Sequence, residues 1–401
     1  MSETRRAEPF ATEQGAAIPP GDPSAHLPGG APTPSWRLLD RLVLVGAALV
    51  LVVPALMLAA GFKPALIENR PLRVMPAFSV NGLVDGSWFK GVDAFLADNI
   101  KVRPTAVHLR GDAFYLTGGT GTTDVLRGKG TWLFPTNAFN PTCVFGVDQV
   151  TATLTREAAA FARAGVAFRF IVVPDKQTIY PEQVASNPFP TACTDVRRPA
   201  LRTWIDGLGQ DGIDAWPLED AAKAANPAAL LWYPGDTHWT SAGALAVVRA
   251  LVMSFQPNVW ADSQVVTAPQ HKHVDDLARS MGLSRAERLP MITGRAGSVV
   301  VQTKDPVSVQ LVAAPYIWTT TVTGQPTVPG RTLIIYDSAF AEQQDLVAPW
   351  FASATWVRLP DMSRHPELAR ELGPFDTVIV EQVERFAYTT DFDQLLSGFA
   401  N

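Results

Sequence analysis

Two short segments of the chain hold the residue types of a nucleophilic acyl-transfer site. Asp236 and His238 stand one residue apart in the segment Gly235 to Thr240 (GDTHWT), and Ser338 stands far downstream in Tyr336 to Phe340 (YDSAF). In such a site the histidine takes the hydroxyl proton of the serine, while the aspartate orients and stabilises the imidazole. If the three side chains converge, the chemistry is that of a hydrolase or acyltransferase working through a serine ester.

Each segment also has a purely structural interpretation. Alternate side chains of an extended segment share a face, so Asp236 and His238 can point into one crevice, or the pair can cap a helix that starts at Ser241. Ser338 follows an apolar strand, at the end where open parallel sheets bind ligands, but a serine there can equally be a helix N-cap. Its surroundings do not match the Gly-x-Ser-x-Gly elbow, because Tyr336 and Phe340 occupy the glycine positions.

The elements that would position these residues alternate between helices and strands. Apolar residues from Val147 to Phe161 recur at helical spacing, and Ala167 to Val173 (AFRFIVV) has the composition of a strand buried on both faces. Ser241 to Phe255 predicts a long apolar helix with Thr240 or Ser241 as its N-cap. Further strands are predicted at Arg331–Tyr336, Thr355–Leu359 and Thr377–Glu381. The order predicts an α/β fold with a mostly parallel sheet covered by helices on both faces.

Residues from about 262 to 330 interrupt this alternation. Three consecutive short strands are predicted there, at Ser298–Thr303, Val307–Ala313 and Tyr316–Thr323. We expect them to form a β-rich, antiparallel insertion in the α/β domain.

Composition narrows the class of function. The chain has 401 residues, a formal net charge of -5 and 47% hydrophobic residues, so it can bury a large core and gives no electrostatic sign of binding nucleic acid. Six histidines and two cysteines form no dense metal-ligand cluster, and His271-Lys272-His273 is interpreted as a solvated polar loop rather than half of one. We therefore expect no metal and no cofactor.

The N-terminal part predicts a membrane anchor. Leu42 to Phe62 is an uncharged apolar run, long enough for a helix to cross a hydrocarbon core of about 30 Å, and Pro54 is compatible with that. Arg37 and Arg41 precede the run and favour an N-terminus in the cytoplasm. The alternative is a cleaved signal peptide, whose apolar region is usually shorter and rarely follows such a long tail. We predict a disordered cytoplasmic tail (1–36), a transmembrane anchor (37–62) and an extracytoplasmic, periplasmic domain (63–401), as in a single-pass protein of the cytoplasmic (inner) membrane.

The only two cysteines would then lie outside the cytoplasm. Cys143 and Cys193 are a candidate disulfide in an oxidising compartment, and two buried free thiols are the alternative.

Several short motifs in one order resemble a known family. Glu68-Asn69-Arg70 follows the apolar run, Gly128 to Phe134 (GKGTWLF) forms a turn, and Val173 to Lys176 (VPDK) precedes Tyr180-Pro181. The segment Asp236 to Thr240 with Gly243-Ala244, then Ser338, then Val378 to Arg385 (VIVEQVER) complete the series. Together they resemble the AlgX/AlgJ-like, alginate O-acetyltransferase-like group of the SGNH-hydrolase-like superfamily.

The resemblance implies a Ser338–His238–Asp236 triad in a Rossmann-type α/β/α sandwich. It implies an O-acetyltransferase that acetylates a cell-envelope or secreted polysaccharide through an acetyl-serine intermediate, with a multi-pass membrane O-acyltransferase as the acetyl donor. Ser338 N–H is a candidate oxyanion donor, and Tyr336 departs from the family, which commonly has glycine there. The alternatives are a polysaccharide O-acetylesterase and a non-catalytic glycan-binding or assembly component of an envelope complex.

The acceptor side of such a site needs groups that bind sugars. Trp239, Tyr233, Lys176 and Tyr336 are the candidate substrate-binding residues, because they lie in or beside the motifs and three of them are aromatic. For any single aromatic residue, burial in the core is the alternative.

Overall fold

The computed structural model describes residues 34–61, 72–100, 103–139, 147–184, 202–210, 213, 215–217, 219–224, 229–312, 316–387 and 389–399. The chain divides into two compact units, Met1–Phe62 and Lys63–Asn401, which are considered separately. The described part of the first unit is helix α1 (Pro34–Ala59) with a short turn after it.

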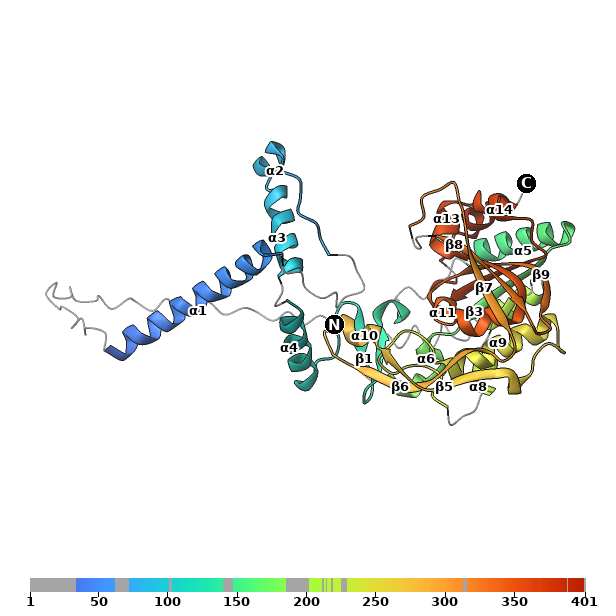
Figure 1. The fold of residues 1–401 in the computed structure, drawn as a ribbon, viewed down its shortest axis with the longest axis horizontal. Coiled ribbons are helices and arrows are strands. Elements are labelled where there is room, and N and C mark those ends of the chain that lie inside the picture. The colour runs from blue at the N-terminus through green and yellow to red at the C-terminus, as the bar shows by residue number, and fades with distance from the viewer. Residues whose placement is uncertain are drawn as a thin grey trace, which may run out of the picture. The chain divides into compact units, whose positions relative to one another are not determined.

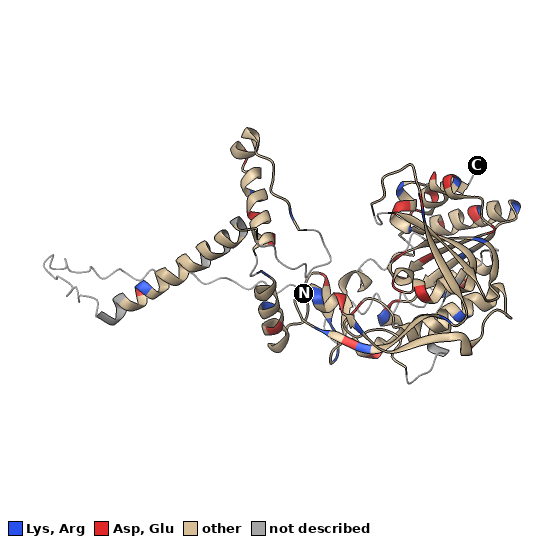
Figure 2. Ribbon diagram, viewed as in Figure 1, with Lys and Arg blue, Asp and Glu red and all other residues tan. Residues whose placement is uncertain are grey.

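The predicted membrane anchor is not found. Among the residues that the structure describes, no helix is long and apolar enough to cross a membrane. The prediction of a single-pass protein of the inner membrane with a periplasmic domain is therefore wrong. The apolar run was expected to be helical as far as Phe62, but α1 ends at Ala59 and includes the charged residues Asp40 and Arg41 near its start (Figure 2).

Two other predictions fall on residues outside the described ranges. Cys143 and Cys193 both lie there, so their proposed disulfide stays a prediction. The same holds for residues 1–33 of the predicted disordered tail.

The second unit is built on a seven-stranded sheet, whose strands β7 to β11 are orange to red and whose strand β3 is green in Figure 1. Its strand order is β4-β3-β11-β9-β10-β8-β7. The first five strands run parallel, and β8 and β7 continue the sheet in antiparallel pairing. The bounds are β3 (Ala167–Val173), β4 (Ala215–Pro217), β7 (Val299–Asp305), β8 (Ile317–Thr323), β9 (Val328–Tyr336), β10 (Phe351–Arg358) and β11 (Thr377–Val383).

Hydrophobic cores lie on both faces of this sheet, because successive strand residues point to opposite sides. On β3, Phe170 and Val172 join a core with α5 (Val147–Arg163), whereas Ile171 and Val173 join a core with α9 (Ser241–Phe255). A sheet buried on both faces in this way is the three-layered α/β/α arrangement predicted from the sequence.

The other elements complete these layers or precede them. The helices are α2 (Val80–Val84), α3 (Ser87–Asn99), α4 (Arg103–Leu116), α6 (Lys176–Ile179), α8 (Glu219–Ala224), α10 (Asp276–Ser280), α11 (Ser338–Ala341), α12 (Gln344–Val347), α13 (Leu359–Arg364), α14 (Leu368–Leu372) and α15 (Phe392–Leu396), with a further helix over 202–210. Strands β1 (Val125–Arg127) and β2 (Leu133–Pro135) form a small antiparallel pair.

The predicted insertion proves to be two different structures. Its first part is a long antiparallel hairpin of β5 (Val265–Val274) and β6 (Ala286–Arg295), joined through α10. Its second part, β7 and β8, extends the main sheet instead of forming a separate body.

The middle strand predicted in this region, Val307–Ala313, does not form over its described residues 307–312. The backbone N–H of Ser308 donates to Glu371 Oε1 (2.6 Å), and that of Val312 donates to Asp361 Oδ1 (2.7 Å). Because side chains accept these backbone donors, the segment runs over the surface without pairing to a neighbouring strand.

Candidate active site

The loop that carries Asp236 and His238 is held at both ends. Trp232 and Trp239 form an antiparallel bridge across it, and Thr240 is the N-cap of α9, its Oγ1 accepting from Gly243 N at 3.3 Å. The cap is therefore Thr240, one of the two predicted residues. The alternative in which Asp236 and His238 cap this helix does not apply.

Asp236 is the centre of a dense hydrogen-bond cluster. Its Oδ1 accepts from the backbone N (2.8 Å) and the ring Nδ1 (2.7 Å) of His238, and its Oδ2 accepts from Asp276 N (2.7 Å) and His273 Nε2 (2.9 Å). The side chain is only 2% exposed. Burial alone would raise the pKa of this carboxyl, but the hydrogen bonds from the two histidines outweigh burial and hold the pKa well below its usual range. Asp236 is thus a fixed carboxylate.

His238 has the orientation that a general base needs. Its Nδ1 faces Asp236, and its Nε2 is buried without a hydrogen-bond partner in the described part of the chain. Burial lowers the pKa of His238, but the bond to Asp236, with its negative charge and those of Asp276 and Glu342, raises the pKa above its ordinary value overall. With Nδ1–H donated to the carboxylate, the Nε2 lone pair is the free one.

Ser338 lies where β9 turns into α11. The N-cap of this short helix is Asp337, whose Oδ1 accepts from Ala339 N (2.9 Å) and whose Oδ2 accepts from Val383 N (2.8 Å). Ser338 is the first residue of the helix and is partly exposed, so it is not the cap that the structural alternative required.

A direct contact links the Ser338 turn to the Asp236–His238 loop. The indole Nε1 of Trp239 donates to the carbonyl of Ala339 at 3.0 Å, and its ring stacks on Phe340 at 6.1 Å. The structure therefore brings together the two segments singled out in the sequence. His238 Nε2 makes no hydrogen bond to Ser338 in the described part of the chain. The contact between the two segments is therefore made by Trp239 and not by His238.

Beneath the Ser338 turn lies a buried acid that the sequence reading missed. Glu381, at the carboxyl end of β11, is fully buried, and its Oε2 accepts from Asp337 N (3.0 Å) and Phe340 N (3.4 Å). Burial and the neighbouring Asp337 raise the pKa of Glu381 well above its usual range. A neutral carboxyl thus supports the turn from below. The sequence contains one sign of this residue: Glu381 directly follows the four uncharged residues Thr377 to Val380 of a predicted strand.

The hairpin supplies further acidic and imidazole groups. His273, on β5 and not in a loop as expected, stacks on Tyr233 with ring centroids 3.9 Å apart. Burial raises the pKa of Asp275 to about 6 and that of Glu287 to about 7. Both carboxylate oxygens of Asp275 are buried without a partner in the described structure. The run His271 to Asp276 (HKHVDD) was the sequence feature that could have indicated these residues, but its first part was interpreted only as a solvated polar loop.

Two sets of side chains here have the spacing of metal ligands. They are Asp236 with His273 and Asp275, and Asp236 with His238 and Asp276, with ligand atoms within 4.8 Å of one another. Both sets depend on Asp236, each of whose oxygens already accepts two hydrogen bonds. A metal ion bound to Asp236 would have to replace its hydrogen bond to His238 or to His273. The donors therefore fit a hydrogen-bonded cluster better than a metal centre.

The four candidate substrate-binding residues are placed differently from one another. Lys176 is 2% exposed, and its Nζ donates to the carbonyls of Tyr233 (3.1 Å), Pro234 (2.9 Å) and Asp236 (2.7 Å). It therefore shapes the loop from below, and burial lowers its pKa to about 7. Trp239 and Tyr336 are each 1% exposed, and Tyr233 is 5% exposed.

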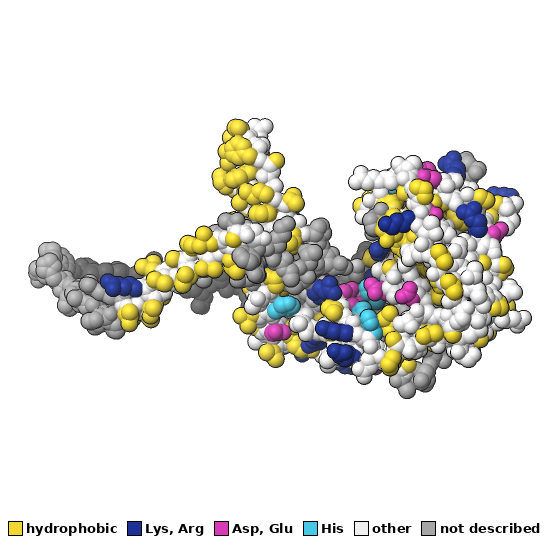
Figure 3. All heavy atoms as spheres, in the orientation of Figure 1, with side chains coloured by type: hydrophobic (Ala, Val, Ile, Leu, Met, Phe, Trp, Pro, Cys, Tyr) yellow, Lys and Arg dark blue, Asp and Glu magenta, His cyan; other side chains and the backbone are white. Residues whose placement is uncertain are grey.

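A small cavity adjoins His238. Its volume is about 140 Å³, and Tyr233, Trp239 and His273 are among the residues that line it, together with Glu342. Of the four candidates, Tyr233 and Trp239 thus border the cavity, while Lys176 and Tyr336 are not in its lining. Figure 3 shows histidine side chains beside carboxylates on this face of the molecule.

Part of the chain matches a known protein family. Residues 125–311 match the model of the family described as SGNH hydrolase-like domain, acetyltransferase AlgX. This confirms the resemblance and the expected class of enzyme, an SGNH-type acetyltransferase. The matched segment includes Asp236 and His238 and ends before Ser338.

Solved structures that resemble the chain do so at low sequence identity. The O-acetyltransferase domain of Pseudomonas putida AlgJ is 17% identical, with 68% of this chain and 98% of that one covered and a TM-score of 0.46. Bacillus cereus PatB1 is 14% identical, with 67% of this chain and 98% of that one covered and a TM-score of 0.47. Pseudomonas aeruginosa AlgX is 10% identical, with 68% of this chain and 67% of that one covered and a TM-score of 0.43. No curated protein matches the chain.

Proposed function

Because residues 125–311 of this chain match the model of the family described as SGNH hydrolase-like domain, acetyltransferase AlgX, we propose that the protein O-acetylates a polysaccharide through an acetyl-Ser338 intermediate. The observation that supports the proposal is the 2.7 Å bond from His238 Nδ1 to Asp236 Oδ1, which leaves Nε2 buried and unpartnered in a loop whose next residue, Trp239, donates to Ala339 O at 3.0 Å. An oriented imidazole with a free lone pair is the base that a serine nucleophile requires.

In the first half-reaction, Ser338 Oγ attacks the carbonyl carbon of a donor acetyl ester. Its proton passes to His238 Nε2, and Asp236 stabilises the imidazolium that forms. The carbonyl oxygen gains negative charge as the tetrahedral intermediate forms. As the first residue of α11, Ser338 has an N–H with no acceptor inside the helix, which makes it a suitable donor to that oxygen. Collapse expels the donor's alcohol, which takes the proton from His238 and leaves acetyl-Ser338.

In the second half-reaction, a sugar hydroxyl attacks the acetyl group. His238 removes the hydroxyl proton, and the intermediate then collapses to the acetylated sugar while Ser338 Oγ recovers a proton from His238. If water attacks instead, the same steps give acetate, which is the esterase alternative. As the acetyl donor we propose the multi-pass membrane O-acyltransferase that the family resemblance implies.

The proposal is tested by the turnover of p-nitrophenyl acetate by the full chain. Ser338→Ala is expected to lower the rate of acetyl release by roughly 10³-fold or more, because the nucleophile is lost. Ser254→Ala is the matched control. That serine is on α9, its hydroxyl donates to Leu251 O at 2.7 Å, and it does not line the cavity beside His238.

The products then separate the alternatives. Mass spectrometry of the quenched wild-type reaction is expected to find an acetyl group on Ser338, and added oligosaccharide is expected to become acetylated. Acetate release without transfer to any sugar would indicate the esterase. Equal rates for wild type and Ser338→Ala, with no acetyl-serine, would exclude the acyl-enzyme and support a non-catalytic glycan-binding role.

A further inference from the structure

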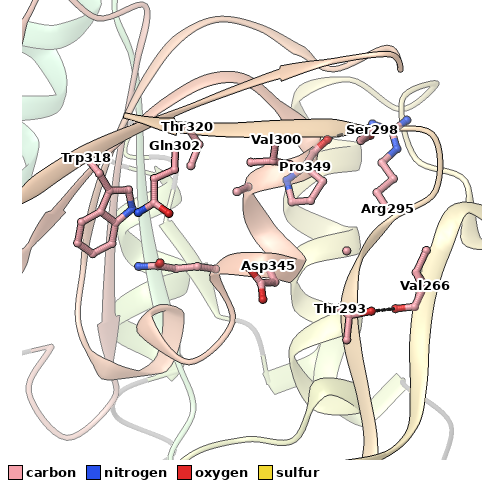
Figure 4. A pocket seen from close by; sticks show the side chains of 13 residues that line it. Val266, Thr293, Arg295, Ser298, Val300, Gln302, Trp318, Thr320, Asp345 and Pro349 are labelled. Carbon is pink, nitrogen blue, oxygen red and sulfur yellow. Dashed lines mark hydrogen bonds between the residues drawn. The ribbon is translucent and has the colours of Figure 1, made fainter. Parts of the chain in front are cut away.

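A second cavity, of about 330 Å³, lies between the hairpin, the edge of the main sheet and α12. Figure 4 shows Trp318 and Gln302 at one end of it, Arg295 and Ser298 at the other, and Asp345 between them. The volume is within the range typical of small-ligand sites. None of these residues belongs to the proposed triad.

The lining has hydrogen-bonding capacity that the protein does not use. The hydroxyl of Ser298 is buried without a partner in the described structure. No described residue forms a hydrogen bond with the Gln302 amide, the Trp318 indole N–H or the Asp345 carboxylate, and Gln344 has a single weak one, to Tyr336 (3.4 Å). The Ser298 hydroxyl is the buried group of this set, whereas Gln302 and Asp345 are exposed and Trp318 is partly buried. A buried hydroxyl without a protein partner, at the wall of a cavity, is a group for which a polar ligand can supply the partner.

The charges in the cavity favour an uncharged ligand. Arg295 is 5% exposed, and its guanidinium donates to Gln264 Oε1 (2.7 Å) and to the carbonyls of Pro326 (2.7 Å), Pro349 (3.3 Å) and Val259 (3.1 Å). The guanidinium of Arg295 is therefore already hydrogen-bonded to acceptors of the protein itself. Asp345 is the acidic side chain of the lining that forms no hydrogen bond with a described residue, and a carboxylate accepts from hydroxyls and repels a second carboxylate.

Two shared elements connect this cavity to the one beside His238. On β6, Met291 and Ile292 line the cavity beside His238, and Thr293 to Arg295 line the second one. Asp345 of α12 lines both. Since a strand rises about 3.3 Å per residue, the two cavities adjoin at a spacing that one bound chain of sugars can span.

We propose that this second cavity is the acceptor subsite, and that it binds an uncharged section of the polysaccharide next to the residue that is acetylated. Hydroxyl groups both donate and accept, so they can satisfy Asp345, Gln302 and Ser298 together, with the Trp318 indole N–H as a further donor. The inference rests on the proposed function for its substrate class. It deepens that function by excluding acidic sugars at this subsite.

The test is equilibrium binding to the full chain without an acetyl donor, measured by calorimetry. The probes are cellohexaose, mannohexaose and chitohexaose, with hexagalacturonate as the acidic probe. At least one neutral probe is expected to bind, and hexagalacturonate is expected to bind at least tenfold more weakly. Gln302→Ala and Asp345→Asn are each expected to weaken binding of the neutral probe about fivefold to tenfold, because each removes a hydrogen bond to the sugar.

Thr303→Ala is the matched control. Strand residues two apart share a face, so Ser298, Val300 and Gln302 line the cavity while the exposed Thr303 points away, and its loss is expected to leave affinity unchanged. Binding of none of the neutral probes, equal affinity in wild type and Gln302→Ala, or tight binding of hexagalacturonate would overturn the proposal. A chain that binds sugar but transfers no acetyl group would contradict the proposed function and leave the subsite standing.

Discussion

Asp236 is shared between two histidines, which is more than a triad aspartate needs. His238 holds Oδ1 and His273 holds Oδ2, so the carboxylate cannot rotate without losing one of them. The side chain of His273 is 17% exposed and stacks on Tyr233, which fixes its ring. His273 is therefore a positioning residue: it acts on the chemistry through Asp236 and not through the substrate.

This arrangement makes a prediction about pH. His273 draws electron density from Asp236, so its replacement by phenylalanine, which keeps the stack on Tyr233, leaves the carboxylate a stronger acceptor for His238. The pKa of His238, already raised above its ordinary 6.5, is then expected to rise further. The acidic limb of the kcat/KM profile for p-nitrophenyl acetate should move to higher pH, with a loss at pH 7 by a factor on the order of 10.

The sign follows from the role of the base. His238 must be neutral to accept a proton, so activity is lost as pH falls through its pKa, and a higher pKa moves that loss upward. A lower rate for His273→Phe with an unchanged limb would mean that His273 only packs. The matched control is His365→Phe, a histidine whose Nδ1 contacts Glu367 Oε1 at 3.1 Å and which is not in the cavity lining.

At the scale of elements, the sequence predicted the strands and helices that have long apolar runs, and it missed the β5–β6 hairpin. The strand Ala167–Val173 and the helix Ser241–Phe255 were predicted with their observed bounds, because an uninterrupted apolar run and a capped helix are strong signals. The β5–β6 hairpin was not predicted, since β5 is mostly exposed and each strand contains a proline and no regular alternation of apolar and polar residues. That hairpin carries His273 and Glu287, so the missed element explains the missed residues.

The aspartate-histidine loop is packed tightly against the corner between the hairpin and α10. A Cβ added to Gly235 would lie 2.2 Å from Asp275 Oδ2, and the Gly235 carbonyl accepts from Ala278 N at 3.0 Å. Gly235→Ala is expected to destabilise the fold by about 1–3 kcal/mol through overpacking, and to lower activity by moving Asp236. Thermal unfolding and p-nitrophenyl acetate turnover measure the two effects.

A double variant identifies the contact responsible. Asp275→Ala removes the colliding carboxylate, so Gly235→Ala should cost less stability in that background, with an interaction free energy of about 1 kcal/mol or more. Strict additivity of the two changes would contradict the packing argument. Gly207→Ala is the control: a Cβ there meets no atom within 4 Å, and it lies in the helix over 202–210, so no loss is expected.

At the scale of the whole molecule, hydrophobic cores cover both faces of the parallel part of the sheet, while edge strand β7 is mostly exposed, and a group of buried ionisable residues lies around the aspartate-histidine loop. The acidic groups there include Asp275 and Glu287, while Lys176 places a buried amine beneath the loop. Composition indicated the large core but not this group of residues, because Lys176, Asp236 and the hairpin acids come from segments far apart in the chain. Their ionisation should therefore be visible in the stability of the protein.

Asp275→Asn tests this at the level of global unfolding. Burial raises the pKa of Asp275 to about 6 from an ordinary 3.8, so the folded state holds its proton longer than the unfolded state. Ionisation of Asp275 then destabilises the fold as pH rises through that window. The variant should match wild type near pH 4 and exceed its free energy of unfolding at pH 7.5 by on the order of 1–2 kcal/mol, since solvent screens part of the shift. Urea denaturation across this pH range measures it, with Asp112→Asn, which replaces an exposed aspartate on α4, as the control variant. An Asp275→Asn difference that does not change with pH would mean that Asp275 ionises in the fold as it does in the unfolded chain.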